Sequence, residues 1–317
     1  MKRNYKVSII GSGNVGGLVA LRIAESRMAD TLLVDIKEGL ALGKTLDLED
    51  SLSALGLDSK IEGTTDISKI EDSDVVVITA GFIRTANKTR EELLKINAET
   101  IRSISKDLKK YTPLAKIIVV TNPVDVLTYL LIRETEFSPK RVFGMGTSLD
   151  SARFSNLIAK ELNISTKDIN STVIGPHGEG MIPLPRFTMI RGICLDEFLE
   201  GDRIKDLARG TIQRGAQIIS LLGNQSAYFG PSQAILEIIK IIIKDEKRVV
   251  YLSSYLNGEY GVKDLCIGVP CRLGREGIEE IIELDLNEEE REAFLKSTNY
   301  IKEQCNSMVI NSKRNGL

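Results

Sequence analysis

Histidine and cysteine are scarce in this sequence, which contains one histidine and four cysteines among 317 residues. The cysteines, Cys194, Cys266, Cys271 and Cys305, show no C-x-x-C spacing, and no group of histidines accompanies them. A disulfide framework or a zinc site needs such groupings. We therefore expect no structural disulfide and no bound metal.

Long apolar runs are missing as well. No segment approaches the roughly 20 apolar residues of a membrane-spanning helix. The first apolar run, from Val7 to Gly11, is interrupted by Ser8 and is too short for the hydrophobic region of a secretion signal. The sequence therefore predicts no membrane partner and a cytoplasmic location.

Charge of one sign is not in excess, because 42 Lys and Arg residues stand against 44 Asp and Glu residues, for a net charge of -2. Nucleic-acid-binding proteins usually present a basic face, and this mixture predicts none, so no nucleic-acid partner is expected. Hydrophobic residues make up 42% of the chain. This content and length suit one large α/β domain or two parts of about 150 residues each.

Short β-branched runs alternate with segments of helical spacing in the first half of the chain. The expected strands are Lys6–Ile10, Thr31–Asp35, Asp74–Thr79, Lys116–Thr121 and Val142–Gly144, and the expected helices include Val15–Met28 and Arg90–Lys109. Repeated alternation of strand and helix is typical of a parallel sheet with helices on both faces. We predict an α/β fold in which residues 1–146 form a doubly wound parallel sheet.

The second half of the chain is more mixed. After a helix expected at Ser148–Leu162 come a proline-punctuated stretch, a helix at Ser232–Lys244, hairpin strands at Val249–Leu256 and Lys263–Val269, and a charged helix capped by Asn287. Residues 147–317 are predicted to form an α+β substrate domain. Since no flexible linker separates the two parts, we expect them to pack closely, with the active site between them.

A glycine-rich loop follows the first expected strand. Its residues, Gly11, Ser12, Gly13, Asn14, Val15 and Gly16, satisfy G-x-G-x-x-G between a strand and a helix, the context required of a dinucleotide-binding Rossmann domain. The three glycines permit a tight turn, close approach of a pyrophosphate, and packing of helix on strand. A glycine turn without a ligand is the alternative.

Asp35 ends the second expected strand. At this place a carboxylate can accept hydrogen bonds from the ribose hydroxyls of a dinucleotide and repel a 2'-phosphate. The sequence therefore favours NAD over NADP. A capping aspartate without a ligand is the alternative here.

The one histidine, His177, lies in a loop, residues 175–180, that is rich in glycine. Histidine is suited to proton transfer near neutral pH. Asp150 and Arg153 stand three positions apart on the helix expected at 148–162, so both can project toward one cleft. An exposed histidine without function and a surface ion pair are the alternatives.

Five motifs occur in the order that they have in lactate and malate dehydrogenases: Leu33–Ile36, Thr79–Gly81, Thr121–Asp125, Leu149–Phe154 and His177–Gly178. Together with the glycine loop and the segment Ser226–Tyr228, they span nearly the whole chain. The chain thus resembles the lactate/malate dehydrogenase family. The resemblance implies NAD as the cofactor and reversible hydride transfer between the cofactor and a 2-hydroxy acid.

The resemblance also implies roles for single residues. His177 would exchange a proton with the substrate oxygen, Asp150 would hold the imidazole, and Arg153 would bind a substrate carboxylate through two parallel hydrogen bonds. Asn122 would contact both the substrate oxygen and the cofactor. The remaining positions that match the family's cofactor site are Thr79, Ala80, Gly81, Asn97, Val120 and Thr121.

Three further positions concern the choice of substrate. Arg84 and Arg90 match the two arginines of the family's mobile lid, and Arg90 would polarise the reacting carbonyl. Arg84 stands where lactate enzymes carry glutamine, and Ala227 where they usually carry threonine, so both positions favour a dicarboxylate. Residues 85–88, Thr-Ala-Asn-Lys, lack the family's usual proline and glycine, which leaves an altered substrate range open.

The substrate pair predicted in this way is L-malate and oxaloacetate. Two alternatives stay open, namely a dehydrogenase of lactate or another 2-hydroxy acid, and an NAD-binding sensor without turnover. An NAD-using glycosidase would need a metal site, for which the sequence offers no cluster of cysteine and histidine. The resemblance also implies a homodimer or a homotetramer.

Overall fold

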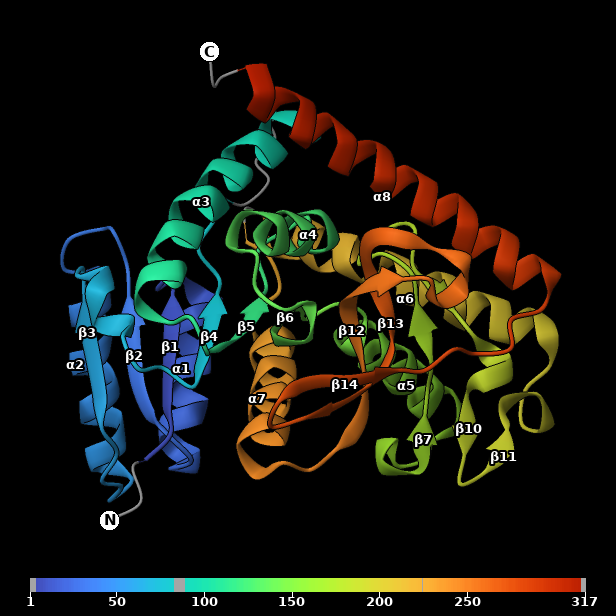
Figure 1. Ribbon diagram of the computed structural model, residues 1–317. Helices are drawn as coiled ribbons and strands as arrows, with labels where there is room; N and C mark the ends of the chain where they lie inside the picture. Colours follow the sequence, from blue (N-terminus) through green and yellow to red (C-terminus); the bar gives the residue numbers. More distant parts are fainter. Residues whose placement is uncertain (1–3, 83–88, 224, 315–317) are drawn as a thin grey trace.

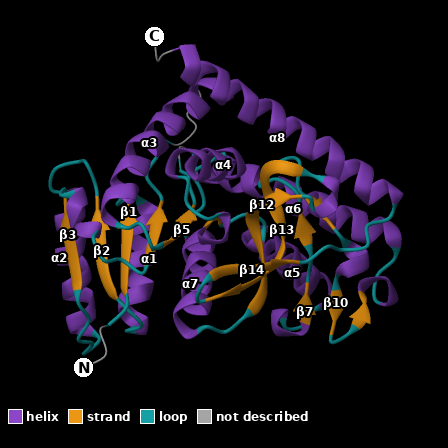
Figure 2. Ribbon diagram, viewed as in Figure 1, coloured by secondary structure: helices purple, strands orange, loops and turns teal. Residues whose placement is uncertain are grey.

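The protein, described here from a computed structural model, is built on one sheet with the strand order β14-β13-β12-β6-β5-β4-β1-β2-β3 (Figure 1). The structure describes residues 4–82, 89–223 and 225–314, and for Arg90 and residues 309–314 it describes the main chain alone. Helices lie on both sides of the sheet (Figure 2).

Short runs of β-branched residues and leucine form the parallel half of the sheet. These strands are β1 (Lys6–Ile10), β2 (Asp30–Val34), β3 (Ile61–Thr64), β4 (Val75–Ile78), β5 (Lys116–Val119) and β6 (Val142–Gly144). Their pairing is parallel throughout, and Ile10 of β1 aligns with both Val34 and Ile78. The strand order reverses at β1, and doubly wound sheets bind their ligands at such a point. The predicted fold class is confirmed.

Helices cover both faces of this sheet because successive side chains of a strand point to opposite faces. In β4, Val75 and Val77 pack with α1 and α7, whereas Val76 and Ile78 pack on the other face with α3, α4 and α8. The helices are α1 (Asn14–Ser26), α2 (Leu40–Ala54), α3 (Arg90–Tyr111), α4 (Val124–Thr135), α5 (Ser148–Leu162), α6 (Gly201–Leu222), α7 (Phe229–Lys244) and α8 (Glu288–Arg314).

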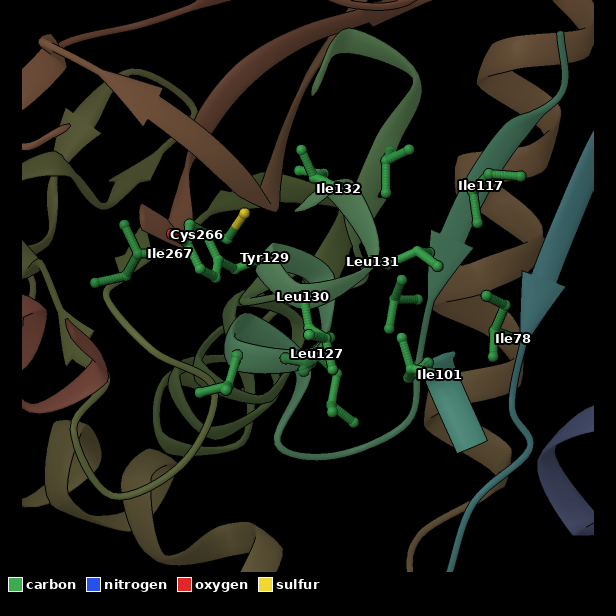
Figure 3. Close-up of a cluster of buried hydrophobic side chains, with 14 of the residues drawn as sticks. Ile78, Ile101, Ile117, Leu127, Tyr129, Leu130, Leu131, Ile132, Cys266 and Ile267 are labelled. Atoms are coloured by element: carbon green, nitrogen blue, oxygen red, sulfur yellow. The ribbon is translucent and has the colours of Figure 1, made fainter. Parts of the chain in front are cut away.

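Helix α4 is enclosed on all sides. Its residues are buried without a break from Val124 to Ile132. Figure 3 shows its side chains reaching toward Ile117 of β5 on one side and toward Cys266 of β13 on the other. The helix therefore forms a rigid platform between the parallel strands and the C-terminal hairpin.

Three helices, α2, α4 and α6, lie outside the helical segments expected from the sequence. The run Val124–Ile132 of α4 is buried on every side, and such a continuous apolar run does not by itself distinguish a buried helix from a buried strand. Helix α6 contains Gly210 and Gly215, and glycine lowers helix propensity. The helix expected at Ser148–Leu162 is confirmed as α5.

The C-terminal half extends the same sheet with antiparallel strands. These are β12 (Arg248–Asn257), β13 (Lys263–Gly274) and β14 (Gly277–Ile281), and β12 joins β6 where Ser253 pairs with Gly144. The expected hairpin is thus confirmed, with longer strands. Because the sheet continues across residue 146, the division into domains 1–146 and 147–317 stays a prediction.

Two small sheets complete this half of the chain. One contains β7 (Ile169–Asn170), β10 (Met189–Ile190) and β11 (Ile193–Cys194), and the other contains β8 (Val173–Ile174) and β9 (Ile182–Pro183). Phe154 and Ile158 of α5 and Leu207 of α6 share a buried cluster with residues of these strands. The small sheets and the two helices thus form a packed unit beside the hairpin.

The last helix begins where its cap predicts. Asn287 Oδ1 accepts a hydrogen bond from the N–H of Glu290 at 2.9 Å, and the Glu290 carboxylate accepts one from the N–H of Asn287 at 2.9 Å. This reciprocal arrangement is a capping box. Among the described residues, no helix is both long and apolar enough to cross a membrane.

Candidate active site

The glycine loop lies at the carboxyl end of β1, where the strand order reverses. Gly11 has a φ of 110°, a region that favours glycine, and a Cβ there would lie 2.5 Å from the main-chain nitrogen of Ala80. A Cβ on Gly16 would lie 1.9 Å from the carbonyl oxygen of Gly11. Close packing of strand, loop and helix therefore requires glycine at both positions.

Gly13 stands in different surroundings, because a Cβ there would meet no atom within 4 Å. This residue is exposed and precedes α1, whose first main-chain N–H groups have no carbonyl partner within the helix. The Lys44 ammonium adds positive charge here by donating a hydrogen bond to the carbonyl oxygen of Gly13 at 2.9 Å. Open space before a helix N-terminus fits the pyrophosphate of a dinucleotide.

Asp35 is held beside this loop. The strand expected to include it ends one residue earlier, at Val34, and its carboxylate accepts hydrogen bonds from the N–H groups of Ser12 at 2.6 Å and Lys37 at 2.9 Å. A carboxylate offers about four acceptor positions. It can therefore also accept hydrogen bonds from ribose hydroxyls.

The ends of β4 and β5 adjoin the glycine loop. The Thr79 hydroxyl donates to the carbonyl oxygen of Gly11 at 2.8 Å, and the Thr121 hydroxyl donates to that of Ala80 at 2.7 Å. A Cβ on Gly81 would lie 2.3 Å from the Thr121 methyl group. The predicted cofactor positions brought together here are Thr79, Ala80, Gly81, Val120 and Thr121.

Asn97 of α3 is fully buried, and main-chain groups occupy its amide. Its Nδ2 donates to the carbonyl oxygens of Asn122 at 2.8 Å and Phe82 at 3.2 Å, while Oδ1 accepts from the N–H of Phe82 at 2.7 Å. Both N–H bonds of the amide are thus used within the protein. A direct cofactor contact by Asn97 stays a prediction. Asn122, by contrast, is exposed just after β5.

Asp150 contacts two other residues that the sequence predicts for the site. Its Oδ2 lies 2.7 Å from Nδ1 of His177, and its Oδ1 accepts a hydrogen bond from the Arg153 guanidinium at 2.9 Å. The side chain of Asp150 is fully buried, whereas those of His177 and Arg153 are 17% and 11% exposed. The three side chains therefore form a largely buried cluster. The two alternatives considered from the sequence, an exposed histidine and a surface ion pair, do not describe it.

Charge pairing sets the protonation of this cluster. Burial opposes the charged form of His177, but the Asp150 carboxylate outweighs burial and raises the pKa of His177 above its ordinary value. Burial likewise opposes ionisation of Asp150, yet His177 and Arg153 hold the pKa of Asp150 below its usual range. An imidazole that donates Nδ1–H to Asp150 exchanges its other proton at Nε2.

His177 lies at the same edge of the sheet as the glycine loop. Asp150 is in the first turn of α5, which follows β6, and the His177 N–H donates to Asp125 in the first turn of α4, which follows β5. The carboxyl ends of parallel strands share one edge of a sheet. The glycine loop and the Asp150 cluster therefore face the same region.

Asp125 and Ser253 are not among the residues predicted for the site. The Asp125 side chain accepts hydrogen bonds from the His177 N–H at 3.0 Å and from the Ser253 hydroxyl at 2.6 Å. Nothing local in the sequence singles out Ser253. For Asp125 the available signals are its place as the last residue of the motif Thr121–Asp125 and its acidic side chain at the start of the apolar run 124–132.

Ala227 lies in the loop between α6 and α7 and is partly buried. In the same loop, Gln225 Oε1 lies 3.5 Å from Nδ2 of Asn14 in the glycine loop. A Cβ on Gly230 would lie 3.0 Å from the Leu149 side chain of α5. The segment around Ala227 thus contacts both the glycine loop and the helix that carries Asp150.

The predicted lid arginines are only partly covered by the structure. Arg84 and residues 85–88 lie outside the described residues, as does the side chain of Arg90. The main chain of Arg90 begins α3, where Thr89 and Glu92 form a capping box. This box fixes the start of the helix that follows the lid.

Comparison with known proteins identifies the family. Residues 5–144 match the NAD binding domain of lactate/malate dehydrogenase, and residues 147–310 match the alpha/beta C-terminal domain of the same family. The chain belongs to the lactate/malate dehydrogenase family. The resemblance expected from the sequence motifs is confirmed, and with it an NAD-dependent oxidoreductase that acts on a small molecule.

The individual relatives include both malate dehydrogenases and lactate dehydrogenases. The malate dehydrogenase of Methanosarcina barkeri is 44% identical over 96% of this chain and 99% of its own. The malate dehydrogenase structure from Picrophilus torridus has a TM-score of 0.95 at 36% identity, covering 99% of this chain and 100% of its own. The Eimeria maxima lactate dehydrogenase structure with NADH and oxamate has a TM-score of 0.96 at 33% identity, covering 100% and 98%. Fold alone therefore does not separate the two activities.

Proposed function

We propose that this protein is an NAD-dependent malate dehydrogenase, which interconverts L-malate and oxaloacetate. The observation that carries the proposal is the buried Asp150 carboxylate, which joins His177 to Arg153 at the sheet edge that also bears the glycine loop. Oxidation of a 2-hydroxy acid requires a proton-transfer group next to a carboxylate-binding group. Curated relatives at 42–44% identity that are named malate dehydrogenase support the same assignment.

His177 is the acid and base in this proposal. Since Nδ1 faces Asp150, Nε2 takes the proton of the malate hydroxyl as C2 loses a hydride, and Asp150 stabilises the resulting imidazolium. In the reverse direction the imidazolium returns the proton to the carbonyl oxygen of oxaloacetate. Bound NAD supplies the hydride acceptor, and NADH the hydride donor.

Three side chains hold the substrate in this proposal. Arg153 binds the carboxylate next to C2, because its planar guanidinium offers five N–H donors and only one is needed for the hydrogen bond to Asp150. Asn122 contacts the reacting oxygen from the end of β5, and Arg90 polarises the carbonyl. Together they orient C2 with respect to His177.

The cofactor is held by main-chain groups and one acid. The N–H groups at the start of α1 bind the pyrophosphate, and the space in front of Gly13 accommodates it. Asp35 binds the adenosine ribose and repels a 2'-phosphate, which selects NAD. Thr79, Ala80, Gly81, Val120 and Thr121 line the rest of the cofactor site, and Asn97 supports it through Asn122.

Arg84 selects malate over lactate in this proposal, with Ala227 leaving room for the second carboxylate. Measuring NADH oxidation with oxaloacetate and with pyruvate tests the selection, and we expect strong preference for oxaloacetate. Arg84→Gln should lower kcat/KM for oxaloacetate by roughly 10-fold to 100-fold, because leaving a charged group without its partner costs about 1–3 kcal/mol. Activity on pyruvate should fall far less.

Arg209→Gln, at an exposed arginine of α6, is the matched control and should leave both activities unchanged. Equal losses on oxaloacetate and pyruvate in Arg84→Gln would remove Arg84 as the specificity residue. A wild-type preference for pyruvate would favour the lactate alternative instead. Tight NADH binding without turnover on either substrate would favour a sensor.

A homodimer or homotetramer and a cytoplasmic location complete the proposal. Exposed apolar side chains support an oligomer, since Leu42 and Leu46 of α2 are 53% and 55% exposed and stand one turn apart. Ile219 and Leu222 at the end of α6 are exposed as well. Apolar groups in such rows are typical of surfaces that a partner subunit covers.

A further inference from the structure

Asp125 is a buried acid to which the proposed reaction assigns no task. It lies in the first turn of α4 and is 2% exposed. Its Oδ2 accepts a hydrogen bond from the main-chain N–H of His177 at 3.0 Å, and its Oδ1 accepts one from the Ser253 hydroxyl of β12 at 2.6 Å. One carboxylate thus connects α4, the hairpin and the histidine loop.

Burying the charged form of a carboxylate at this position costs free energy. Burial raises the pKa of Asp125 to about 6, although the Ser253 hydroxyl, the His177 N–H and the His177 ring all favour the charged form. The N-terminus of α4 favours the charged form too, because the helix dipole is positive there. A buried acid without a task is disfavoured against an apolar side chain of similar size.

Asp125 holds the middle of the histidine loop, residues 175–180, through the main chain of His177. Gly175 is tied to Gly268 of β13 by two main-chain hydrogen bonds, and the carbonyl oxygen of Gly180 accepts one from Ser297 of α8 at 3.0 Å. Between these two ends, the contact to the main chain of His177 comes from Asp125. The anchor is rigid, because α4 is enclosed by β5 and β13 (Figure 3).

We propose that Asp125 is a positioning residue that fixes the main chain of His177 and, through its negative charge, favours the imidazolium form of that side chain. Asp150 then orients the ring through Nδ1, while Asp125 places the residue that carries the ring. The proposal rests on His177 being the proton-transfer residue.

The charged and titratable groups around this pair come from several elements. Asp125 interacts with His177 of the loop and Asp150 of α5, and its charge also acts on Cys266 of β13 and Cys305 of α8. His177 interacts with Asp150, Arg153 and Asp125. Among these groups, Asp125 is the second carboxylate whose charge acts on the imidazole.

Nuclear magnetic resonance can test the charge directly, because His177 is the only histidine of the chain. In tag-free protein, its imidazole signals titrate without overlap from another histidine. Asp125→Asn keeps both hydrogen bonds, since its amide oxygen can accept from His177 and its NH2 can donate to Ser253, but removes the charge. We expect the pKa of His177 to shift downward in Asp125→Asn.

Asp264→Asn is the matched control. Asp264 also links α4 to β12, through the hydroxyls of Tyr129 and Tyr255 at 3.1 Å each, but no hydrogen bond joins it to His177 in the described structure. This variant should leave the His177 titration as in the wild type. Equal titrations in wild type and Asp125→Asn, or equal shifts in both variants, would overturn the electrostatic part of the proposal.

The wild-type protein provides the same test without any substitution. Because His177 is already protonated near pH 6, titration of Asp125 at about that pH should appear as a second inflection of the His177 signals. A single inflection over the whole pH range in which the protein stays folded would contradict the proposal even where Asp125→Asn fails to fold.

Kinetics test the anchoring part. Asp125→Ala removes the contact to the His177 main chain and should lower kcat by roughly 10-fold or more, because displacing a catalytic group by about 1 Å is costly. NADH affinity should be unchanged, and Asp125→Asn should recover most of the lost kcat. Loss of stability with unchanged kcat would reduce Asp125 to a structural role.

Separate experimental results would contradict the proposed function and this inference. Turnover close to that of the wild type in a His177→Asn variant would remove His177 from the reaction while leaving the titration results of the wild-type protein intact. Conversely, an unperturbed titration in Asp125→Asn would leave malate oxidation by His177 untouched.

Discussion

The properties of the His177 side chain depend on the residues around it. Asp150 holds Nδ1, Arg153 pairs with the other oxygen of Asp150, and Asp125 holds the main chain. Asp150 and Arg153 are neighbours on α5, but the contacts of His177 with Asp150 and Asp125 join residues 27 and 52 positions apart. A histidine that would titrate near pH 6.5 when exposed is thereby kept protonated to higher pH.

Replacing this histidine should impair the catalytic step without impairing the binding of NADH. We expect His177→Asn to lower the turnover of oxaloacetate by about 100-fold or more, the usual contribution of a positioned acid-base group. NADH binding, measured by fluorescence titration, should remain because the glycine loop is intact. Turnover close to that of the wild type would exclude His177 from the mechanism.

The raised pKa of His177 also predicts opposite pH profiles for the two directions. Reduction of oxaloacetate uses the imidazolium, so kcat/KM should stay high past pH 6.5 and decline as the pH rises through the raised pKa. Oxidation of malate uses neutral imidazole and should rise over the same range. Profiles of wild-type enzyme in both directions check this, and parallel profiles would contradict it.

The strand-loop-helix unit formed by β1, the glycine loop and α1 is the element that we propose to bind the dinucleotide. Its three glycines perform two kinds of task. Gly11 and Gly16 are required by contacts within the protein, whereas Gly13 borders open space. The same substitution at two of these positions should therefore have different effects.

Gly13→Ala should fold like the wild type, since its φ of -63° suits alanine, but should weaken NADH binding because the methyl group enters the pyrophosphate space. Gly16→Ala should destabilise the protein, because its Cβ would collide with the Gly11 carbonyl. Thermal unfolding and NADH titration of both variants distinguish the two effects. Full NADH affinity in Gly13→Ala would mean that the cofactor lies elsewhere.

Helix α4 illustrates how an element can combine packing with chemistry. Its buried side chains join the parallel strands to the hairpin, and its first turn brings Asp125 to the histidine loop. Because of this continuous burial, the apolar run of α4 is hard to distinguish from that of a buried strand in the sequence. Its importance is visible only once β13 and α8 are placed against it.

In the whole molecule, one continuous sheet carries both halves of the chain. β12 adds to β6, so the strands of the second half extend the dinucleotide-binding sheet. The carboxyl edge of the parallel strands thereby brings the glycine loop, Asn122 and the Asp150 cluster to one region. Apolar side chains on α2 and α6 are exposed at the surface of this molecule, and they are the observation that supports the proposed oligomer.

The assembly can be checked by sedimentation analysis. We expect a mass of two or four chains for the wild type and a smaller mass for Leu46→Arg, because a charge in an apolar interface is costly to bury. Leu114→Arg, at a leucine that is 78% exposed outside the helices, is the control and should keep the wild-type mass. A monomeric wild type would contradict the proposed oligomer.

The sequence by itself determined the parallel strands, the glycine loop and the choice of His177, Asp150 and Arg153 as candidates, because short-range periodicity and motif spacing encode them. Only the tertiary structure decided that Asp125 holds His177, that main-chain groups occupy Asn97, and that the sheet continues across residue 146. Asp125 and His177 are 52 positions apart. A contact of that kind forms only when separate elements pack against each other, so no local pattern in the chain announces it.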